Sequence, residues 1–557
     1  MANPAHPDAT TVFHNGVVFR ADAARTVASA VAVRNGTIVA VGGDAEIAAY
    51  RAGSAEVIDL DGRMLLPGFV DAHAHPVMGG LERLRCDLTE GETIEDYLRT
   101  IGDYAATHPD TPWVTGGGWS MSAFPGGCPD RTVLDVVVPD RPAFLPNRDH
   151  HSGWANSSAL RLAGIDATTA DPADGRIERD AAGNPTGTLH EGAMSLVERL
   201  IPIPTQADFD AGLTEAQRYL HSLGVVGWQD ALVKPEPGAS VHEAYLRAQR
   251  AGRLTARVTG SLWWDRDCPV DEIEGRVTEL AELRAQVSEL GGGYDVGTVK
   301  VMLDGVAETF TAAMLDPYLD ECGCATDHRG LSFLDAELAR AVVIALDAAG
   351  FQIHFHALGD RAVRDALDAL DAAATRNGTA DRRHQLAHLQ LVDPRDIPRF
   401  HTLGAIANLQ ALWAAHEPQI DELTIPFLGP QRAARQYPFG DLLRTGATLA
   451  MGSDWPVSTP DPLAAIHVAV NRITHSAPAG TPALGAHQTL PLPVALSAYT
   501  AGSAWAARLD QFSGTIAVGR PADLVVLDRN PFDGPIEQIG ATGVARTYIG
   551  GRLIHQA

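Results

Sequence analysis

Cysteine is scarce in this chain, since only five occur among 557 residues. Small secreted domains that depend on disulfides carry many more, so the count excludes a disulfide framework. The two closest cysteines, Cys322 and Cys324, enclose a single residue, and His328 follows nearby. A zinc knuckle would need a second cysteine pair at zinc-finger spacing, and the sequence has none. We therefore interpret this segment as a loop that carries two thiols.

Positively charged residues are also few: the chain has 43 Lys and Arg against 69 Asp and Glu, which gives a formal net charge of −26. Such an acidic surface repels phosphate backbones and anionic membranes, so we expect no nucleic-acid partner and no membrane partner. No window has the length of a membrane span. The first residues, MANPAHPDATTVF, lack the basic start and the apolar run of a secretory signal. These absences predict a cytoplasmic protein.

Both ends of the chain are rich in short β-like runs. Asn-Gly pairs at 15–16 and 35–36, each between apolar segments, are strong hairpin signals. The last fifty residues have the same character, in the runs GTIAVGRPADLVVLDRN and GVARTYIGGRLIH. This pattern favours one small sheet domain built from residues 1–65 plus 510–557, although two independent caps would give the same pattern.

Between these ends, apolar strand-like runs alternate with helical patterns, which is typical of a parallel α/β fold. The eight predicted strands lie at 66–75, 224–232, 254–264, 297–305, 350–360, 383–390, 404–412 and 446–457. Eight strand–helix units predict a (β/α)₈ TIM-like barrel over residues 66–509. The long gap after the first strand predicts an insertion subdomain at about residues 80–215.

The placement of polar residues within these strands points to chemistry. Side chains alternate between the two faces of a strand, and a barrel strand turns one face to the helices and the other to the barrel axis. The residues predicted to face the axis are Asp71, His73, His75, Lys300, His354, His356, His384, His388 and Asp454. The last such residue of each strand stands near its C-terminal end, where barrel enzymes build their sites.

Imidazoles and carboxylates that converge in a barrel need a compensating partner, because unpaired polar burial is costly. A divalent cation supplies one. His73 and His75 are separated by one residue on a strand, so they point the same way and can chelate together. A lone His-x-His pair is weak support, but donors on four further strands strengthen it. The sequence therefore predicts a metal site at the mouth of the barrel.

The stretch PGFVDAHAHP, followed by KVMLDG, IHFHALGD, HQLAHLQ and GSDWPV, resembles the amidohydrolase superfamily. Within it, the chain looks most like the third amidohydrolase family, the branch that includes N-substituted formamide deformylases. The resemblance covers nearly the whole chain, since the ends match the composite β-sandwich of the family and DHHSGWANSSAL looks like its insertion.

The resemblance implies roles for six residues. The implied metal ligands are His73, His75, Lys300, His356, His388 and Asp454. Asp454 would also transfer the proton, and His388 would also orient or polarise the carbonyl. Lys300 matches the lysine that binuclear members carboxylate to bridge two metals; the alternative is an ordinary lysine that reaches solvent at the rim. One residue departs from the family pattern: Ala387 stands where the family usually has Glu before the sixth-strand histidine.

The reaction expected from this site is cleavage of the C–N bond in a small, apolar N-substituted amide or formamide. Metal coordination lowers the pKa of bound water to about 7, and the hydroxide attacks the carbonyl while Asp454 takes and returns the proton. Deamination and the opening of a cyclic amide or carbamate are alternatives on the same site, and a non-catalytic binding barrel is another. We expect Zn²⁺, as one ion or as two if Lys300 is carboxylated, although mixed N/O ligands also accept Mn²⁺, Fe²⁺ or Co²⁺.

Further residues are predicted to contact the amide substrate. Trp119 and Trp455 are candidates for an apolar pocket, with simple packing as the alternative for each. Asp149 and His150 lie in the predicted insertion and are candidates for substrate contact, with a surface loop as the alternative. A homodimer is the expected assembly.

Overall fold

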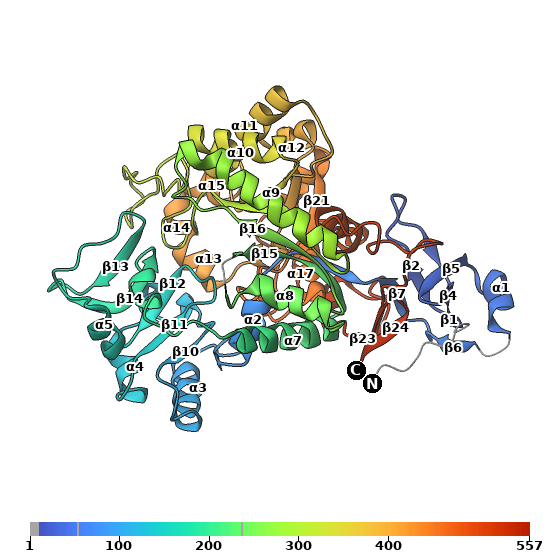
Figure 1. Ribbon diagram of the computed structural model, residues 1–557, viewed down its shortest axis with the longest axis horizontal. Coiled ribbons are helices and arrows are strands. Elements are labelled where there is room, and N and C mark those ends of the chain that lie inside the picture. The colour runs from blue at the N-terminus through green and yellow to red at the C-terminus, as the bar shows by residue number, and fades with distance from the viewer. Residues whose placement is uncertain (1–9, 53–54, 236–237) are drawn as a thin grey trace.

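The computed structural model describes residues 10–52, 55–235 and 238–557. Three regions lie side by side along the long axis, with the barrel in the middle, the insertion on one side and the sheets formed by both termini on the other (Figure 1). The expectation of no secretory signal rests largely on residues 1–9, which lie outside the described residues. No helix in the described ranges combines the length and the apolar character that a membrane span needs.

The barrel is an eight-stranded parallel sheet in the order β8, β15, β16, β17, β18, β19, β20, β21. Its strands are β8 (Phe69–Ala74), β15 (Val225–Val233), β16 (Arg257–Trp263), β17 (Tyr294–Met302), β18 (Gln352–Ala357), β19 (Gln385–His388), β20 (Ile406–Leu409) and β21 (Thr448–Met451). Each strand overlaps one of the eight predicted runs. The predicted fold class, a (β/α)₈ barrel with an insertion and a composite β-sandwich, is confirmed.

The first and last strands meet through the residues that follow β21. The amide of Asp454 donates to the carbonyl of His73 (2.7 Å), and the amide of His75 donates to the carbonyl of Trp455 (2.7 Å). These two bonds bring the chain after β21 against the C-terminal end of β8. The barrel is thereby nearly closed at the edge where the polar side chains gather.

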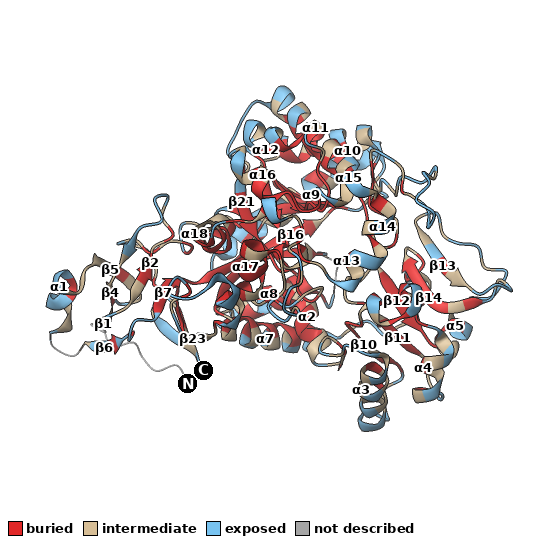
Figure 2. Cartoon of the chain, turned by 180° about the vertical axis from the view of Figure 1, so that it is seen from behind, coloured by how far each residue is buried: buried red, intermediate tan, exposed pale blue. Residues whose placement is uncertain are grey.

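Helices surround the barrel and bury the outward residues of its strands. They are α2 (Pro76–Arg83), α7 (Gln206–Ser222), α8 (Val241–Arg250), α9 (Ile273–Leu290), α10 (Ala336–Ala348), α11 (Asp360–Asn377), α12 (Ile397–Leu403), α16 (Phe439–Arg444) and α17 (Pro462–Asn471). Phe351, Ile353 and Phe355 alternate with polar residues and belong to the main core cluster, all fully buried. The strands at the centre are accordingly buried on both faces (Figure 2), as parallel barrels require.

The connections after β20 and after α17 carry short helices. They are α13 (Pro418–Leu423), α14 (Ile425–Leu428), α15 (Pro430–Ala433), α18 (Leu492–Ser497) and α19 (Ser503–Ala506). Carbonyls at the end of α19 accept from inward-facing barrel residues, Gln352 to Ala506 (2.8 Å) and Thr259 to Ala507 (2.7 Å). This segment therefore fills the N-terminal end of the barrel, opposite the mouth.

The insertion after β8 is a six-stranded sheet in the order β13, β14, β12, β11, β10, β9. Its strands are β9 (Cys86–Asp87), β10 (Val114–Gly117), β11 (Ala143–Pro146), β12 (Ser152–Ala155), β13 (Gly175–Arg179) and β14 (Pro185–Glu191). Its helices are α3 (Ile94–Thr107), α4 (Arg131–Val137), α5 (Ser157–Ala163) and α6 (Ser195–Glu198). An aromatic cluster of Trp119, Phe124 and Trp154 lies in its core.

Two further sheets lie at the ends of the chain: a four-stranded sheet of N-terminal strands in the order β5, β4, β1, β6, and a six-stranded sheet from both ends in the order β24, β23, β22, β7, β2, β3. The elements are β1 (Thr10–His14), β2 (Val17–Phe19), β3 (Val27–Ala28), β4 (Ala30–Arg34), β5 (Thr37–Gly42), α1 (Asp44–Ile47), β6 (Glu56–Asp59), β7 (Met64–Pro67), β22 (Leu524–Leu527), β23 (Val544–Ile549) and β24 (Arg552–Gln556). Because β22 pairs with β7, one sheet holds both ends of the chain. We propose the domain division predicted from the sequence. β7 extends across the predicted boundary at residue 65.

Candidate metal centre

Three ligand-type side chains from the first and last strands converge at the mouth of the barrel. Oδ1 of Asp454 lies 3.2 Å from Nε2 of His73 and 3.0 Å from Nε2 of His75. One donor atom from each of the three residues lies within 4.8 Å of the others. β8 and the segment after β21 are the first and last parts of the barrel in sequence, and the fold places them side by side.

The other three predicted ligands complete the same cluster. Nζ of Lys300 lies 3.2 Å from Nε2 of His73. The ring centroid of His388 lies 4.8 Å from that of His73 and 4.5 Å from that of His356. Lys300 is only 3% exposed, so its side chain points into the barrel and does not reach solvent at the rim.

His388 is the residue whose burial needs an explanation. Within the described part of the chain, neither of its ring nitrogens has a hydrogen-bond partner, and both are buried. The nearest carboxylate oxygen, Oδ2 of Asp454, lies 3.9 Å from Nδ1, and the ring stacks on Trp413 with centroids 5.4 Å apart. An unpaired buried imidazole costs free energy. A cation that accepts the lone pair of one nitrogen removes part of that cost, so the donor set fits a metal ion.

The backbone, rather than strand alternation, aims His388 into the site. His388 and Leu389 have positive φ angles of 81° and 51°, and the amide of His388 donates to Oε1 of Gln410 (2.6 Å). The prediction that His384 shares a face with His388 is wrong. Nε2 of His384 lies 3.2 Å from Oδ1 of Asp347 on α10, outside the barrel. The strand ends in a left-handed turn, which alternation does not anticipate.

Asp71 is a second position where simple alternation fails. The pairing of β8 with β15 shifts register beside Asp71, and Ala72 packs with the inward-facing Ile406 and Ala450. Asp71 does not join the ligands. Its Oδ1 instead accepts from the amides of His73 and Ser453, both at 3.0 Å. It anchors the backbone of both strands that carry ligands, and burial raises the pKa of Asp71 to about 7.

His354 lies one layer below the cluster and contacts a predicted ligand directly. Its Nε2 is 2.8 Å from Nδ1 of His73, and its Nδ1 is 3.5 Å from Oγ of Ser261. If Nε2 of His73 is to bind a cation, Nδ1 must carry the proton and donate it to His354. His354 therefore fixes both the tautomer and the orientation of the His73 ring.

The charge states in this cluster suit metal binding. Burial, reinforced by the charge of Lys300, lowers the pKa of His73 to about 3, and burial lowers the pKa of His356 and His388 well below the usual range. Neutral imidazole is the form that binds a metal. Burial opposes the charge of Asp454, but the neighbouring His73 holds its pKa well below the usual range. Burial also lowers the pKa of Lys300 to about 7.

Asp304 orients His356, although it was not among the residues predicted from the sequence. Its Oδ1 lies 3.3 Å from Nδ1 of His356, and its Oδ2 accepts from the amides of Gly359 (2.8 Å) and Ala313 (3.0 Å). A ligand histidine held by a carboxylate through its second nitrogen is a common arrangement in metal sites. The signal in the sequence was an acidic residue two positions after the end of β17.

The insertion contributes an ion pair to the mouth of the barrel. Nδ1 of His151 lies 2.9 Å from Oε1 of Glu191, which also accepts from Oγ1 of Thr311 (2.7 Å). The ring of His151 lies 5.8 Å from that of His356. Burial alone would lower the pKa of His151, but the carboxylate of Glu191 raises it to about 9. The sequence assigned no role to Glu191.

The four residues predicted to contact substrate lie in different surroundings. Trp119 is fully buried in the core of the insertion, where its Nε1 donates to the carbonyl of Leu145 (2.7 Å). Trp455 is 4% exposed, and its ring packs on Tyr219 of α7. Trp119 offers no surface to a ligand and therefore serves packing. Substrate contact by Trp455, whose ring is almost fully buried, stays a prediction.

Asp149 and His150 lie in the loop between β11 and β12, beside the ion pair. Oδ1 of Asp149 accepts from the amide of His151 (2.8 Å), and Nε2 of His150 lies 3.3 Å from Oε1 of Glu82 on α2. This contact places the loop against α2, which begins directly after His75. Both residues border the mouth of the barrel and remain candidates for substrate contact.

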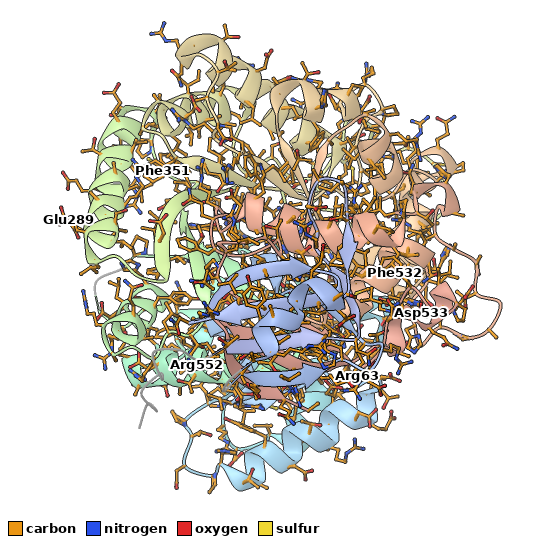
Figure 3. The ribbon with its side chains drawn as sticks, turned by 90° about the vertical axis from the view of Figure 1, so that its right-hand side faces the viewer. Arg63, Glu289, Phe351, Phe532, Asp533 and Arg552 are labelled. Atoms are coloured by element: carbon orange, nitrogen blue, oxygen red, sulfur yellow. The ribbon has the colours of Figure 1, made fainter. Side chains whose placement is uncertain are left out.

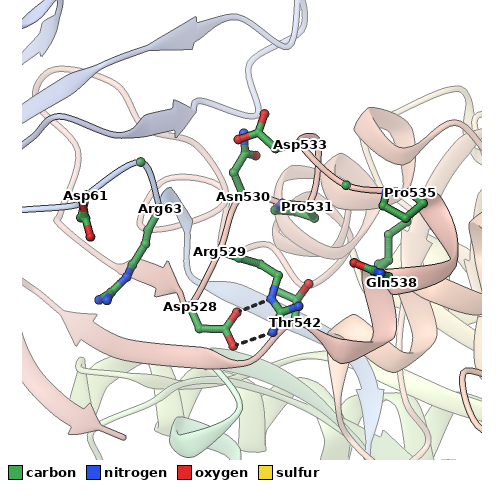
Figure 4. A pocket seen from close by; sticks show the side chains of 13 residues that line it. Asp61, Arg63, Asp528, Arg529, Asn530, Pro531, Asp533, Pro535, Gln538 and Thr542 are labelled. Atoms are coloured by element: carbon green, nitrogen blue, oxygen red, sulfur yellow. Dashed lines mark hydrogen bonds and ion pairs between the residues drawn. The ribbon is translucent and has the colours of Figure 1, made fainter.

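A cavity of about 520 Å³ lies elsewhere, between the turn after β6 and the segment that follows β22 (Figure 4). Its lining includes Arg63, Asp533 and the ion-paired Asp528 and Arg529. Figure 3 shows Arg63, Phe532 and Asp533 on the side of the molecule that carries the sheets of the termini. No histidine or cysteine is among the lining residues. The cavity therefore has no part in the metal cluster.

Comparison with known proteins agrees with this geometry. The sequence profile of the amidohydrolase family matches residues 56–555. N-substituted formamide deformylase from Arthrobacter pascens is 30% identical over 97% of this chain and 97% of its own length. Protein LONG AFTER FAR-RED 3 from Arabidopsis thaliana is 30% identical over 99% of this chain and 92% of its own length.

Among solved structures, an uncharacterized metal-dependent hydrolase from Pyrococcus horikoshii OT3 has the same fold. The TM-score is 0.72 at 23% sequence identity, and the match covers 95% of this chain and 99% of that one.

Proposed function

Since the chain belongs to the amidohydrolase family, we propose that it is a metal-dependent hydrolase that cleaves the C–N bond of a small, apolar N-substituted amide. Formamides are the first substrates to test. The buried imidazole of His388, whose ring nitrogens have no hydrogen-bond partner among the described residues, carries the proposal, because it lies beside His73, His356 and Asp454 at the mouth of the barrel. A barrel that only bound a ligand or supported an assembly would have no reason to keep that arrangement.

The proposed ligands are His73, His75, Lys300, His356, His388 and Asp454. A divalent ion held by these residues would lower the pKa of a bound water and polarise the substrate carbonyl. Zn²⁺ is the proposed metal, since imidazole nitrogens and one carboxylate suit it. A second ion needs a carboxylated Lys300. Lys300 is buried with its Nζ 3.2 Å from Nε2 of His73, so a carbamate formed on it would lie among the other proposed ligands and would supply anionic oxygens to a second ion.

Asp454 is the proposed proton carrier. Its carboxylate is 6% exposed and is oriented by His73 and His75, so one oxygen is fixed while the other lies toward His388. A carboxylate held in this way accepts a proton from the attacking water and returns it to the departing nitrogen. His388, whose ring is fixed by stacking on Trp413, orients the carbonyl of the substrate.

The choice of an N-substituted amide rests on the formamide deformylase, whose similarity extends over almost the full length of both chains. The ring of Trp413 stacks on that of His388, so an aromatic side chain lies beside the cluster. The ion pair of His151 and Glu191 lies beside His356 and adds polar groups there. A substrate with one amide carbonyl and one apolar substituent suits this combination of apolar and polar side chains.

The test combines elemental analysis of the purified protein with a panel of substrates. N-alkyl and N-aryl formamides, acetamides, cyclic amides and aminated rings are offered to the zinc-loaded protein, and the products are identified. Release of formate and a free amine is the expected result. Release of ammonia from a ring, or ring opening without a released fragment, would replace the proposed reaction with deamination or cyclic amide hydrolysis. Less than stoichiometric metal together with no turnover would refute the proposal.

The cytoplasmic location and the homodimer stay predictions. Size-exclusion chromatography with light scattering measures the second directly.

A further inference from the structure

A second group of metal-ligand side chains lies in the insertion, away from the barrel cluster. Nε2 of His190 on β14 is 3.0 Å from Oε1 of Glu178 on β13 and 3.9 Å from Sγ of Cys128, which precedes α4. All three donor atoms lie within 4.8 Å of one another. The residues come from one hairpin and from the loop that faces it, and the proposed hydrolase reaction uses none of them.

The geometry does not fit a nucleophilic triad. In such a triad the nucleophile and the acid contact opposite nitrogens of the histidine. Here the thiol and the carboxylate approach the same nitrogen, and the opposite nitrogen, Nδ1, contacts Oγ of Ser152 (2.7 Å). Ser152 is fully buried, so no substrate reaches its hydroxyl. Three donors that converge on one point, instead of forming a line, are the arrangement of a metal site.

The distances suit a tetrahedral zinc ion. Zn–S and Zn–N bonds of about 2.3 and 2.0 Å imply a sulfur–nitrogen separation of roughly 3.5 Å. The observed 3.9 Å is close to that separation and needs only a small contraction. The hydroxyl of Ser152 holds the second nitrogen of the histidine and so fixes its orientation, as the outer partners of metal ligands do.

Binding of a divalent cation would displace two positive charges from the cluster, the proton of the Cys128 thiol and the guanidinium of Arg176. Burial raises the pKa of the Cys128 thiol to about 12, so the thiol is protonated in the absence of metal and loses its proton when metal binds. Glu178 also pairs with Arg176, whose side chain is 49% exposed and can turn into solvent. A thiolate, a carboxylate and a neutral imidazole together balance the charge of a divalent cation.

We propose that Cys128, Glu178 and His190 form a zinc-binding site in the insertion, with water as the fourth ligand. The site is separate from the barrel centre and does not depend on the proposed hydrolysis. Zinc there ties the β13–β14 hairpin to the loop before α4. His190 immediately precedes Glu191, so an ion in this site also steadies the residue that holds His151 at the mouth of the barrel.

Cobalt substitution tests the proposal because the barrel cluster contains no thiol ligand. The full-length protein carrying His73→Ala and His75→Ala is titrated with Co²⁺, with Cys128→Ser and the matched control Cys268→Ser added to that background. We expect a thiolate-to-cobalt charge-transfer band with one equivalent bound, lost in Cys128→Ser and kept in Cys268→Ser. Absence of the band in the parent, or its survival in Cys128→Ser, would overturn the site.

A second measurement uses the unmodified chain, in case the cysteine variant folds poorly. Alkylation of each cysteine is followed by peptide mapping with and without one equivalent of Zn²⁺ beyond that held by the barrel. We expect Zn²⁺ to slow the alkylation of Cys128 at least tenfold and to leave Cys268 unchanged. Equal rates at Cys128 with and without Zn²⁺ would exclude zinc binding by this thiol, whatever the hydrolytic activity of the protein.

Discussion

The barrel and the insertion each contain a cluster of metal-ligand side chains, but the two clusters differ in how many of their buried nitrogens form hydrogen bonds. In the barrel, the donors come from five strands far apart in sequence, and neither ring nitrogen of His388 has a hydrogen-bond partner among the described residues. In the insertion, His190 has partners on both ring nitrogens, Ser152 and Glu178. The barrel cluster therefore needs a cation to compensate its buried polar atoms, whereas the insertion cluster is also stable without one.

Because of this difference, we expect the barrel cluster to bind a metal ion more tightly than the insertion cluster. A site that leaves a buried nitrogen unpaired without metal recovers that cost when the ion binds. A site with satisfied hydrogen bonds must break them first, so its ion is held less tightly. We expect the barrel ion to survive dialysis against a chelator that empties the insertion.

His73→Ala should abolish both metal binding in the barrel and turnover. The variant removes a ligand whose Nε2 faces Asp454 and Lys300, and it frees the carboxylate to pair elsewhere. Elemental analysis measures the metal content, and turnover of whichever substrate the panel yields measures the activity. The control is His384→Ala, since His384 contacts Asp347 outside the barrel and should keep both metal and activity. Equal metal loss in both variants would contradict the assignment of His73 as a ligand.

Asp454→Asn should keep much of the metal and lower kcat by about 10²–10⁴-fold, because an amide cannot accept and return the proton. Steady-state kinetics and metal content are measured on the same preparation. Asp461→Asn is the matched control, since Asp461 caps α17 through the amide of Leu463 (2.9 Å) and Asn caps equally well. Retained activity in Asp454→Asn would remove the proton-carrier role.

His354→Phe should weaken metal binding about 10–100-fold, the usual cost of losing an outer partner of a ligand histidine. His354→Gln should restore most of the affinity, because its side-chain oxygen can accept the proton of His73 Nδ1. Competition with a chelator gives the affinity, and the melting temperature reports any loss of packing. If the two variants bind metal equally, the role of His354 is packing alone.

His151→Gln should reduce the loss of stability at alkaline pH. The pKa of His151 is raised from 6.5 to about 9, so its ion pair stabilises the fold fully below pH 6.5, and the contribution is lost as pH rises through 9. Its side chain is 13% exposed, and the change between these pH values is on the order of 2 kcal/mol.

Urea unfolding at pH 6.5 and at pH 9 measures this difference for wild type and variant. Glu191→Gln should remove the same pH dependence, because it takes away the other half of the pair. An unchanged pH dependence in both variants would show that the pair does not form.

The sequence predicted the eight strands of the barrel and the residues that gather at its mouth. It succeeded because period-two alternation over buried strands such as β18 leaves few arrangements for Gln352, His354 and His356. It misplaced Asp71 and His384 for a physical reason. A register shift and a left-handed turn change the face of a side chain without changing its neighbours in sequence.

The tryptophans show a different limit. Trp119 and Trp455 fit a pocket as well as a core when only the sequence is known, since a large ring is used in both. Their burial against the insertion core and against α7 was decided by packing between segments distant in the chain. The roles of Asp304, His151 and Glu191 likewise depended on which loops meet at the mouth.

Local periodicity and residue chemistry were enough to predict the fold class, the strands of the barrel and the kinds of ligand at its mouth. Three other features follow only from the way distant segments pack. The ring nitrogens of His388 have no hydrogen-bond partner in the described part of the chain, His354 contacts His73, and the insertion brings together both the pair of His151 with Glu191 and its own three-residue cluster. These are contacts across tens to hundreds of residues, and local sequence carries no information on distances of that kind.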